Sequence, residues 1–203
     1  MFITFEGIDG SGKSVHSKLL FNYLKKKHVK VILVREPGGT KIAEQIRNIL
    51  LDKKNKEIFD MTEVLLFLAA RSQLVHEKIK PALKKKYWVV CDRYVDSTIA
   101  YQVYGKGLKF NDIKKINNIA TNNLMPDITF FLDAFNIKYI NFQDRIEIRN
   151  YNSYKKIYDG YKKIARENPK RFFTIDTKCK RYVAHENILK VIDIFLKNKQ
   201  NKK

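Results

Sequence analysis

The sequence predicts an α/β fold in which helices cover both faces of a mostly five-stranded parallel sheet. Short apolar segments of strand length alternate with helical patterns along the whole chain, which is typical of such sheets. No linker and no internal repeat divides the sequence, so residues 1–203 are predicted to form a single domain. With 44% hydrophobic residues, a chain of this length can bury a sizeable core.

Each predicted strand is a short run rich in β-branched or aromatic residues. Gly7 directly follows the first run, and Asp92 directly follows the third. Most of the runs are apolar throughout, so we expect strands that are buried on both faces. The predicted strands are residues 2–6, 29–34, 88–91, 127–132 and 172–175.

Helical patterns fill most segments between these strands. Asp60 or Thr62 is expected to cap the longest helix, and the Pro and Gly content of residues 35–40 predicts a turn. Residues 135–154 have no clean period and are predicted to be a loop or a short mobile helix. The predicted helices are about 13–27 (core side Leu19, Leu20, Phe21 and Leu24), the segment marked by Ile42, Ile46, Ile49 and Leu50, about 60–83, and 188–196.

The formal net charge is +20, from 41 Lys and Arg residues against 21 Asp and Glu residues. A charge of this size can indicate binding to nucleic acid or to a membrane surface. However, only nine of the cations are Arg, and the lysines are spread along the chain instead of forming one stripe. These observations favour a Lys-rich compositional bias, so we expect neither a nucleic-acid nor a membrane partner.

Several protein classes are excluded by simple features of the sequence. Two cysteines, Cys91 and Cys179, cannot build a disulfide framework or a four-thiolate zinc site, and they suit a reducing compartment. No window approaches the roughly 18 consecutive apolar residues of a membrane span. The first residues lack a basic segment followed by an apolar one, so we expect no secretory signal.

Residues 7–14 read Gly-Ile-Asp-Gly-Ser-Gly-Lys-Ser, which fits the P-loop pattern G-x-x-x-x-G-K-[ST]. The pattern directly follows a predicted strand and opens a predicted helix. Glycines let backbone N–H groups curl around an anion, and the helix N-terminus adds further donors. Lys13 is expected to reach the outer phosphates of a nucleotide, and Ser14 to ligate Mg²⁺. We therefore expect a three-layer α/β/α fold of the P-loop NTPase type.

The rest of the chain narrows the kind of P-loop protein. A GTPase should carry an N-K-x-D motif, which is absent, and a motor usually needs a larger core and an acidic pair after its third strand. Here that strand ends in Asp92, a plausible partner for magnesium water, and Arg93, which can hold a phosphate. A small-molecule kinase is the best interpretation, because phosphoryl transfer needs mainly positioning and charge neutralisation.

Several segments together resemble one family, the thymidylate kinases, in the bacterial form whose P-loop carries a glycine. The segments keep the family's order and spacing and span most of the chain. The combination of REPGGT with DRY-x-x-S-x-x-A-Y is quite specific, whereas a P-loop alone is not. The matching segments are FEGIDGSGKS at 5–14, REPGGT at 35–40, LLFLAAR at 65–71, DRYVDSTIAYQ at 92–102, PDITFFLD at 126–133 and DRIE at 144–147.

The resemblance implies transfer of the γ-phosphoryl group of ATP to dTMP, giving dTDP for dTTP biosynthesis, with Mg²⁺ present. The implied ATP-binding residues are Gly7, Ile8, Asp9, Gly10, Ser11, Gly12, Lys13 and Ser14, and the metal residues are Ser14 and Asp92. The implied dTMP-binding residues are Asp9, Arg35, Phe67, Arg71, Arg93, Ser97, Thr98 and Tyr101.

These implied roles match the chemistry of the side chains. Arg35 and Arg93 would grip the dTMP phosphate, because a guanidinium matches phosphate bidentately. Phe67 would stack on thymine and Arg71, four residues later on the same helix face, would reach a base carbonyl. The hydroxyls of the Ser-Thr pair at 97–98 would bond the base edge.

Two further roles concern the sugar and the reacting groups. Tyr101 would sit under the sugar, where its bulk disfavours a 2′-hydroxyl group. Asp9 is unusual in a loop that attracts anions. By resemblance it meets the sugar and phosphate region of the acceptor and helps with magnesium or with the transferred proton.

The resemblance also implies an arginine that stabilises the transferring group. Relatives with glycine at Gly10 supply this arginine from a lid, here about residues 134–154, so the candidates are Arg145 and Arg149. The implied catalytic set is Asp9, Lys13, Arg93 and Arg145.

The predicted lid departs from the family. Residues 134–143 hold one cation, Lys138, and no glycine, so the lid looks shortened. Two alternatives therefore stay open: another nucleoside monophosphate kinase, and a nucleotide-binding protein with impaired catalysis. A cytoplasmic homodimer is also implied, with the helix at about 60–83 as a plausible interface.

Overall fold

The computed structural model describes residues 1–135, 145–146 and 151–200. Five parallel strands form one sheet in the order β2-β3-β1-β4-β5. Every predicted strand is confirmed, with its ends placed within two residues. The strands are β1 (Phe2–Glu6), β2 (Val31–Arg35), β3 (Trp88–Asp92), β4 (Ile128–Asp133) and β5 (Phe172–Asp176).

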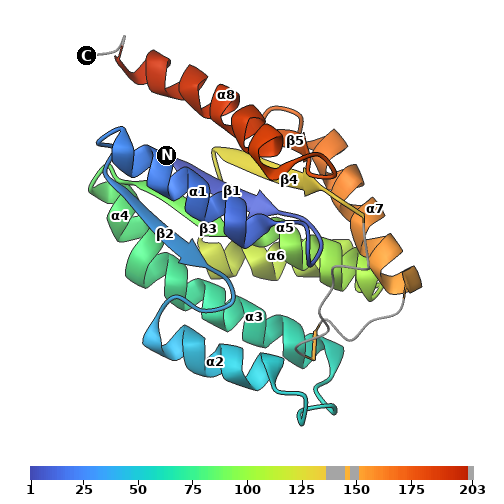
Figure 1. Ribbon diagram of the computed structural model, residues 1–203. Coiled ribbons are helices and arrows are strands. Elements are labelled where there is room, and N and C mark those ends of the chain that lie inside the picture. Colours follow the sequence, from blue (N-terminus) through green and yellow to red (C-terminus); the bar gives the residue numbers. More distant parts are fainter. Residues whose placement is uncertain (136–144, 147–150, 201–203) are drawn as a thin grey trace.

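Helices cover both faces of the sheet, which confirms the predicted three-layer arrangement (Figure 1). Helices α1 (Lys13–Lys26) and α8 (Arg181–Gln200) lie on one face. Helix α2 (Lys41–Leu51) packs against α3 on the other side of the molecule. The second face carries α3 (Asp60–Leu74), the π-helix η1 (Val75–Ile79), α4 (Lys80–Lys84), α5 (Val95–Thr98), the π-helix η2 (Ile99–Gly105), α6 (Phe110–Thr121) and α7 (Tyr151–Glu167).

Each face of the sheet has its own apolar core. Under α1 and α8, Leu20 and Ile188 pack with Phe5 of β1. On the opposite face, Phe131 of β4 stacks on Tyr161 of α7 with ring centroids 5.6 Å apart. Burying a side chain of this size stabilises the fold by about 1.5–3 kcal/mol. The two cores therefore hold the strands in place, and the loops that follow the strands begin at fixed positions.

The start of α3 differs from its prediction. The helix begins at Asp60, but its N-cap is Phe59, whose side chain makes no capping bond, so neither Asp60 nor Thr62 is the cap. Asp60 and Glu63 instead lie in the first turn, where a negative charge is favoured by the helix dipole. The helical path continues through η1 and α4 and ends at Lys84, close to the predicted end.

Residues 95–121 and 155–167 contain α5, η2, α6 and most of α7, where no helix is predicted from the sequence. In α7 the buried face is built largely from Tyr154, Tyr158 and Tyr161, together with Ile157 and Ile164. Tyrosine is intermediate in burial preference and carries a polar tip, so this stripe does not stand out as apolar. Tertiary packing against the sheet makes it core.

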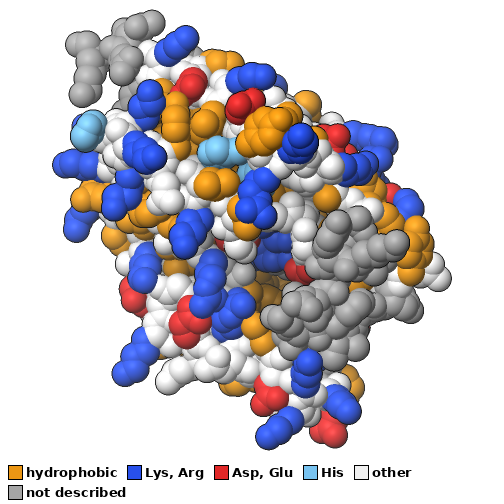
Figure 2. Space-filling view, in the orientation of Figure 1, with side chains coloured by type: hydrophobic (Ala, Val, Ile, Leu, Met, Phe, Trp, Pro, Cys, Tyr) orange, Lys and Arg blue, Asp and Glu red, His pale blue; other side chains and the backbone are white. Residues whose placement is uncertain are grey.

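The surface adds two observations. Figure 2 shows Lys and Arg side chains scattered across the face that it draws. The predicted absence of a nucleic-acid partner stays a prediction. Among the helices that the structure describes, none combines the length and the apolar character needed to cross a bilayer.

A substitution at Gly160 of α7 tests the close packing between α7 and η2. A Cβ added at this position would lie 2.6–2.7 Å from atoms of the Tyr104 side chain, including its Cβ. We expect Gly160→Ala to lower the free energy of unfolding, because overpacking costs about 1–3 kcal/mol and outweighs the roughly 1 kcal/mol that alanine gains in a helix. Chemical denaturation measures the change.

Lys156→Ala on the exposed face of α7 is the matched control and should change the unfolding free energy by less than about 0.5 kcal/mol. Equal or greater stability of Gly160→Ala would contradict the packing described between these two helices.

Candidate active site

The P-loop joins β1 to α1 at the carboxyl edge of the sheet (Figure 1). Gly7, Gly10 and Gly12 have φ angles of +145°, +76° and +93°. A Cβ on Gly7 would lie 2.9 Å from the carbonyl oxygen of Leu132, so only glycine fits at this close approach to β4. The N-cap of α1 is Gly12, which has no side chain that could make a capping bond. The first N–H groups of α1 are therefore available to an anion.

Lys13 is buried at the start of α1, and its ammonium donates to the carbonyl oxygen of Ile8 at 2.6 Å. Burial and, to a lesser extent, the nearby Arg93 together lower the pKa of Lys13 to about 8. An anion in the loop would offset both effects. The Lys13 side chain thus extends across the P-loop, in which we expect the phosphates of the nucleotide to bind.

Ser14 and Asp92 lie next to each other although 78 residues separate them in sequence. The Ser14 hydroxyl donates to Asp92 Oδ2 at 2.5 Å, and the second carboxylate oxygen, Oδ1, is buried with no partner among the described residues. A hard divalent cation prefers a ligand set of hydroxyl and carboxylate oxygens. These two residues fit the metal role predicted for them.

Arg93 follows β3 directly and has a φ angle of +69°. Its Nη1 donates to the carbonyl oxygen of Gly7 at 3.1 Å and to Ser97 Oγ at 3.2 Å. Its Nη2 forms an ion pair with Asp9 and donates to the hydroxyl of Tyr101 at 3.2 Å. The Tyr101 hydroxyl in turn donates to Asp9 at 2.7 Å. The guanidinium therefore ties the P-loop to the segment after β3.

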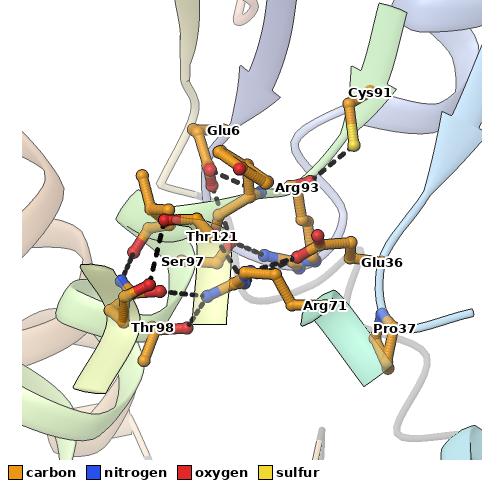
Figure 3. Close-up of polar contacts among 12 residues, drawn as sticks. Glu6, Glu36, Pro37, Arg71, Cys91, Arg93, Ser97, Thr98 and Thr121 are labelled. Carbon is orange, nitrogen blue, oxygen red and sulfur yellow. Dashed lines mark hydrogen bonds and ion pairs between the residues drawn. The ribbon is translucent and has the colours of Figure 1, made fainter. Parts of the chain in front are cut away.

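A second buried arginine, Arg71 of α3, lies in the same region (Figure 3). Its Nε donates to Glu36 at 2.7 Å, Nη1 donates to Thr98 and Asn117, and Nη2 donates to the carbonyl oxygen of Tyr94. Burial raises the pKa of Glu36, whose Oε1 has no hydrogen-bond partner among the described residues. Arg71 and Thr98, both predicted to meet the base, here bond to each other at the cavity wall.

One cavity of about 460 Å³ joins these groups. It extends from the P-loop to the helices of the second face, where Phe67 and Tyr101 supply aromatic walls. Of the predicted site residues, those that line it are Asp9, Gly10, Gly12, Lys13, Ser14, Arg35, Phe67, Arg71, Asp92, Arg93, Ser97, Thr98 and Tyr101. Gly7, Ile8, Ser11 and Arg145 are not among its lining residues.

Two arginines stand at the mouth of this cavity. Arg35 forms a salt bridge with Glu44 at 3.0 Å, and its side chain is 48% exposed. Arg47 of α2 also lines the cavity and donates to the carbonyl oxygen of Pro37 at 2.8 Å. Arg35 thus lines the cavity with an acidic partner that the sequence did not indicate, and its role in binding the dTMP phosphate stays a prediction.

Arg145 is placed differently from the expectation of a residue beside the phosphates. Its Nη2 forms an ion pair with the buried Glu63 at 2.8 Å, and its Nε donates to the carbonyl oxygen of Leu50 at 3.0 Å. The catalytic role of Arg145 stays a prediction. Arg149, the alternative, lies outside the described residues, as does most of the predicted lid.

Some residues of the site were not predicted from the sequence. Glu36 and Gln102 lie inside the matching segments REPGGT and DRYVDSTIAYQ, so those segments contained a signal for them. Arg47 and Leu51 of α2 are brought in by the fold alone. The lining residues that were missed are Val15, Glu36, Pro37, Arg47, Leu51, Gln102 and Ile146, with Glu6 and Tyr161 behind them.

Comparisons with known proteins agree with this geometry. A family model described as thymidylate kinase matches residues 5–188. The thymidylate kinase of Caldanaerobacter subterraneus is 42% identical over 201 residues, which cover 97% of this chain and 96% of that protein. The thymidylate kinase of Mycoplasma capricolum is 38% identical over 211 residues, which cover 100% and 98% of the two chains.

A solved structure agrees as well. The crystal structure of thymidylate kinase from Ehrlichia chaffeensis matches with a TM-score of 0.81 and 38% identity, covering 95% of this chain and 98% of that one. With the P-loop, the arginine that follows β3 and the cavity between them, these matches lead to one conclusion: the chain belongs to the thymidylate kinase family.

Proposed function

We propose that this protein is an ATP-dependent thymidylate kinase that transfers the γ-phosphoryl group of ATP to dTMP and forms dTDP. The observation that carries the proposal is the continuity of one cavity from the P-loop to an aromatic and arginine-lined pocket. A kinase for a nucleoside monophosphate needs this arrangement, because donor and acceptor phosphates must meet in one water-poor space.

The donor side of the site is the P-loop. The triphosphate would lie against the N-terminus of α1, where Lys13 can exchange the Ile8 carbonyl for phosphate oxygens. Ser14 and Asp92 would hold Mg²⁺, and this ion, when bound, supplies charge neutralisation for the transferred group. The buried Oδ1 of Asp92 supports this assignment, because an orphan carboxylate oxygen is costly without a cation or a donor.

The acceptor side lies between α3 and η2. Phe67 would stack on the thymine ring, and Tyr101 would pack under the deoxyribose, where a 2′-hydroxyl would meet its bulk. Arg93 would grip the dTMP phosphate together with Arg35, and Arg47 adds a cation at the same mouth. A nucleotide of this kind carries two charges at the end that faces these cations.

The roles within the reaction follow from charge. An oxygen of the dTMP phosphate attacks the γ-phosphorus in line, while the bond from that phosphorus to the β–γ bridging oxygen breaks and ADP leaves with the bonding electrons. Lys13 and Arg93 balance the charge on the transferring group. Asp9 lies between Arg93 and Tyr101, so it can orient the guanidinium and the sugar together.

We also propose that the protein works as a cytoplasmic homodimer. Large apolar side chains on α2 and α3 and just before α3 are exposed, including Ile42, Ile49, Phe59 and Leu65. A second copy would cover these exposed apolar side chains. Both cysteines are free, which fits a reducing compartment.

A coupled assay with ATP and a panel of acceptors (dTMP, dUMP, CMP and AMP) tests the function. We expect turnover to be fastest with dTMP. A preference for another acceptor would indicate a different nucleoside monophosphate kinase. Normal binding of ATP and dTMP with negligible turnover would indicate a nucleotide-binding protein whose shortened lid prevents catalysis.

Arg93→Lys tests the phosphate grip. Lysine keeps the charge but loses the bidentate fork, so kcat/KM for dTMP should fall roughly 100-fold, as expected for the loss of a charge-assisted bond of about 2–3 kcal/mol. The KM for ATP should change much less. Arg166→Lys, an exposed position on α7, is the control. Unchanged dTMP kinetics in Arg93→Lys would remove Arg93 from the acceptor site.

Arg145→Ala tests the predicted lid arginine. The catalytic role requires the guanidinium to leave Glu63 for the transferring group, and the variant should then lower kcat by at least about 100-fold while the KM for dTMP barely changes. Steady-state kinetics on both substrates measure this. An unchanged kcat with a lower free energy of unfolding would show that Arg145 only anchors the chain against α3.

A further inference from the structure

Glu6, the last residue of β1, is a fully buried carboxylate that the reaction described above does not use. Its Oε1 accepts the backbone N–H of Tyr94 at 2.7 Å. Its Oε2 accepts the hydroxyl of Ser97 at 2.6 Å and the hydroxyl of Tyr161 at 3.1 Å. One carboxylate thus holds three groups, from the turn after β3, from α5 and from α7 (Figure 3 shows Glu6 and Ser97 beside Arg93).

The two hydroxyls held by Glu6 are also the ones that meet Arg93. Ser97 Oγ and the Tyr161 hydroxyl lie 2.8 Å apart, and Arg93 Nη1 donates to them at 3.2 Å and 3.4 Å. An ionised carboxylate can only accept hydrogen bonds. It therefore draws hydroxyl protons toward itself and leaves oxygen lone pairs facing the guanidinium.

Keeping this charge in the core is costly. Burial and, to a lesser extent, the nearby Asp96 together raise the pKa of Glu6 to about 7. Above that pH the folded protein carries a buried negative charge that a neutral residue of the same shape would avoid. The titratable and charged groups that interact with Glu6 are Asp96 (itself paired with Arg171), Arg93, Lys13, Arg71, Cys91 and Tyr161.

We infer that Glu6 is a positioning residue for the acceptor phosphate: through Ser97 and Tyr161, its carboxylate fixes the orientation of the Arg93 guanidinium. The inference rests on the proposed function, in which Arg93 grips the phosphate of dTMP. The hydrogen bonds of Glu6 lead to the two hydroxyls that contact Arg93, and among the described residues none of them leads to the P-loop lysine. Its effect should therefore appear on the acceptor side of the reaction.

Glu6→Gln tests the inference, because it keeps the shape of the side chain and removes the charge. At pH 8 we expect dTMP affinity, measured by titration calorimetry without turnover, and kcat/KM for dTMP to fall at least about tenfold. The KM for ATP should stay within about twofold. The thermal midpoint should be equal or higher, because the buried charge is gone. Glu186→Gln on the exposed surface of α8 is the control.

Two further measurements separate positioning from simple packing. In a double-mutant cycle with Tyr161→Phe, the two losses should be clearly less than additive, since both act on the same guanidinium. As pH falls from 8 to 6, Glu6 becomes protonated in the wild type, so the ratio of wild-type to Glu6→Gln kcat/KM should shrink toward one around pH 7. Titration of the dTMP phosphate cancels in this ratio.

A dTMP affinity of Glu6→Gln within twofold of the wild type overturns the inference, and so does a loss of kcat/KM that is equal for dTMP and ATP. A loss of dTMP affinity that comes with a lower thermal midpoint overturns it as well. The same holds if the ratio of wild-type to Glu6→Gln kcat/KM does not change with pH. Failure of the proposed function can be distinguished from failure of this inference about Glu6. If the wild type binds dTMP but does not phosphorylate it, the binding data still decide the role of Glu6. If the wild type does not bind dTMP at all, both the function and the inference fail.

Discussion

The contact between Arg93 and the P-loop is the interaction on which the site depends. β1 and β3 are neighbours in the sheet with Phe5 opposite Asp92, so the residue after β3 necessarily arrives beside the loop after β1. Arg93 then bonds the Gly7 carbonyl and pairs with Asp9. The Arg93 guanidinium therefore lies between the expected sites of the donor phosphates and of the acceptor phosphate. Negative charge concentrates there during the reaction.

Protein groups hold the arginines of the site in place, and burying these charged groups costs desolvation free energy. Arg71 with Glu36, and Arg93 with Asp9, are ion pairs taken largely out of water, and such pairs rarely stabilise a fold relative to apolar residues. Their benefit is pre-organisation, because a guanidinium already fixed in place loses little further freedom when phosphate binds. Orphan oxygens such as Oδ1 of Asp92 fit the same account, since a ligand or cation would satisfy them.

The sequence could predict the strands and the P-loop because their signals are local. Apolar runs that end in glycine or a charged residue mark the strands, and the glycine spacing around Lys13 marks the loop. The tyrosine-lined α7 and the approach of Glu6 to Tyr161 could not be predicted, because residues 155 positions apart meet only in three dimensions. The pairing of Arg145 with Glu63 is of the same kind, since it depends on how α3 is placed.

The most direct test of the central claim is a crystal structure with dTMP and a non-hydrolysable ATP analogue bound together. The account predicts the analogue's phosphates in the P-loop beside Lys13, the thymine on Phe67, and the dTMP phosphate against Arg93. A nucleotide bound elsewhere, or a dTMP phosphate that makes no contact with Arg93, would contradict it.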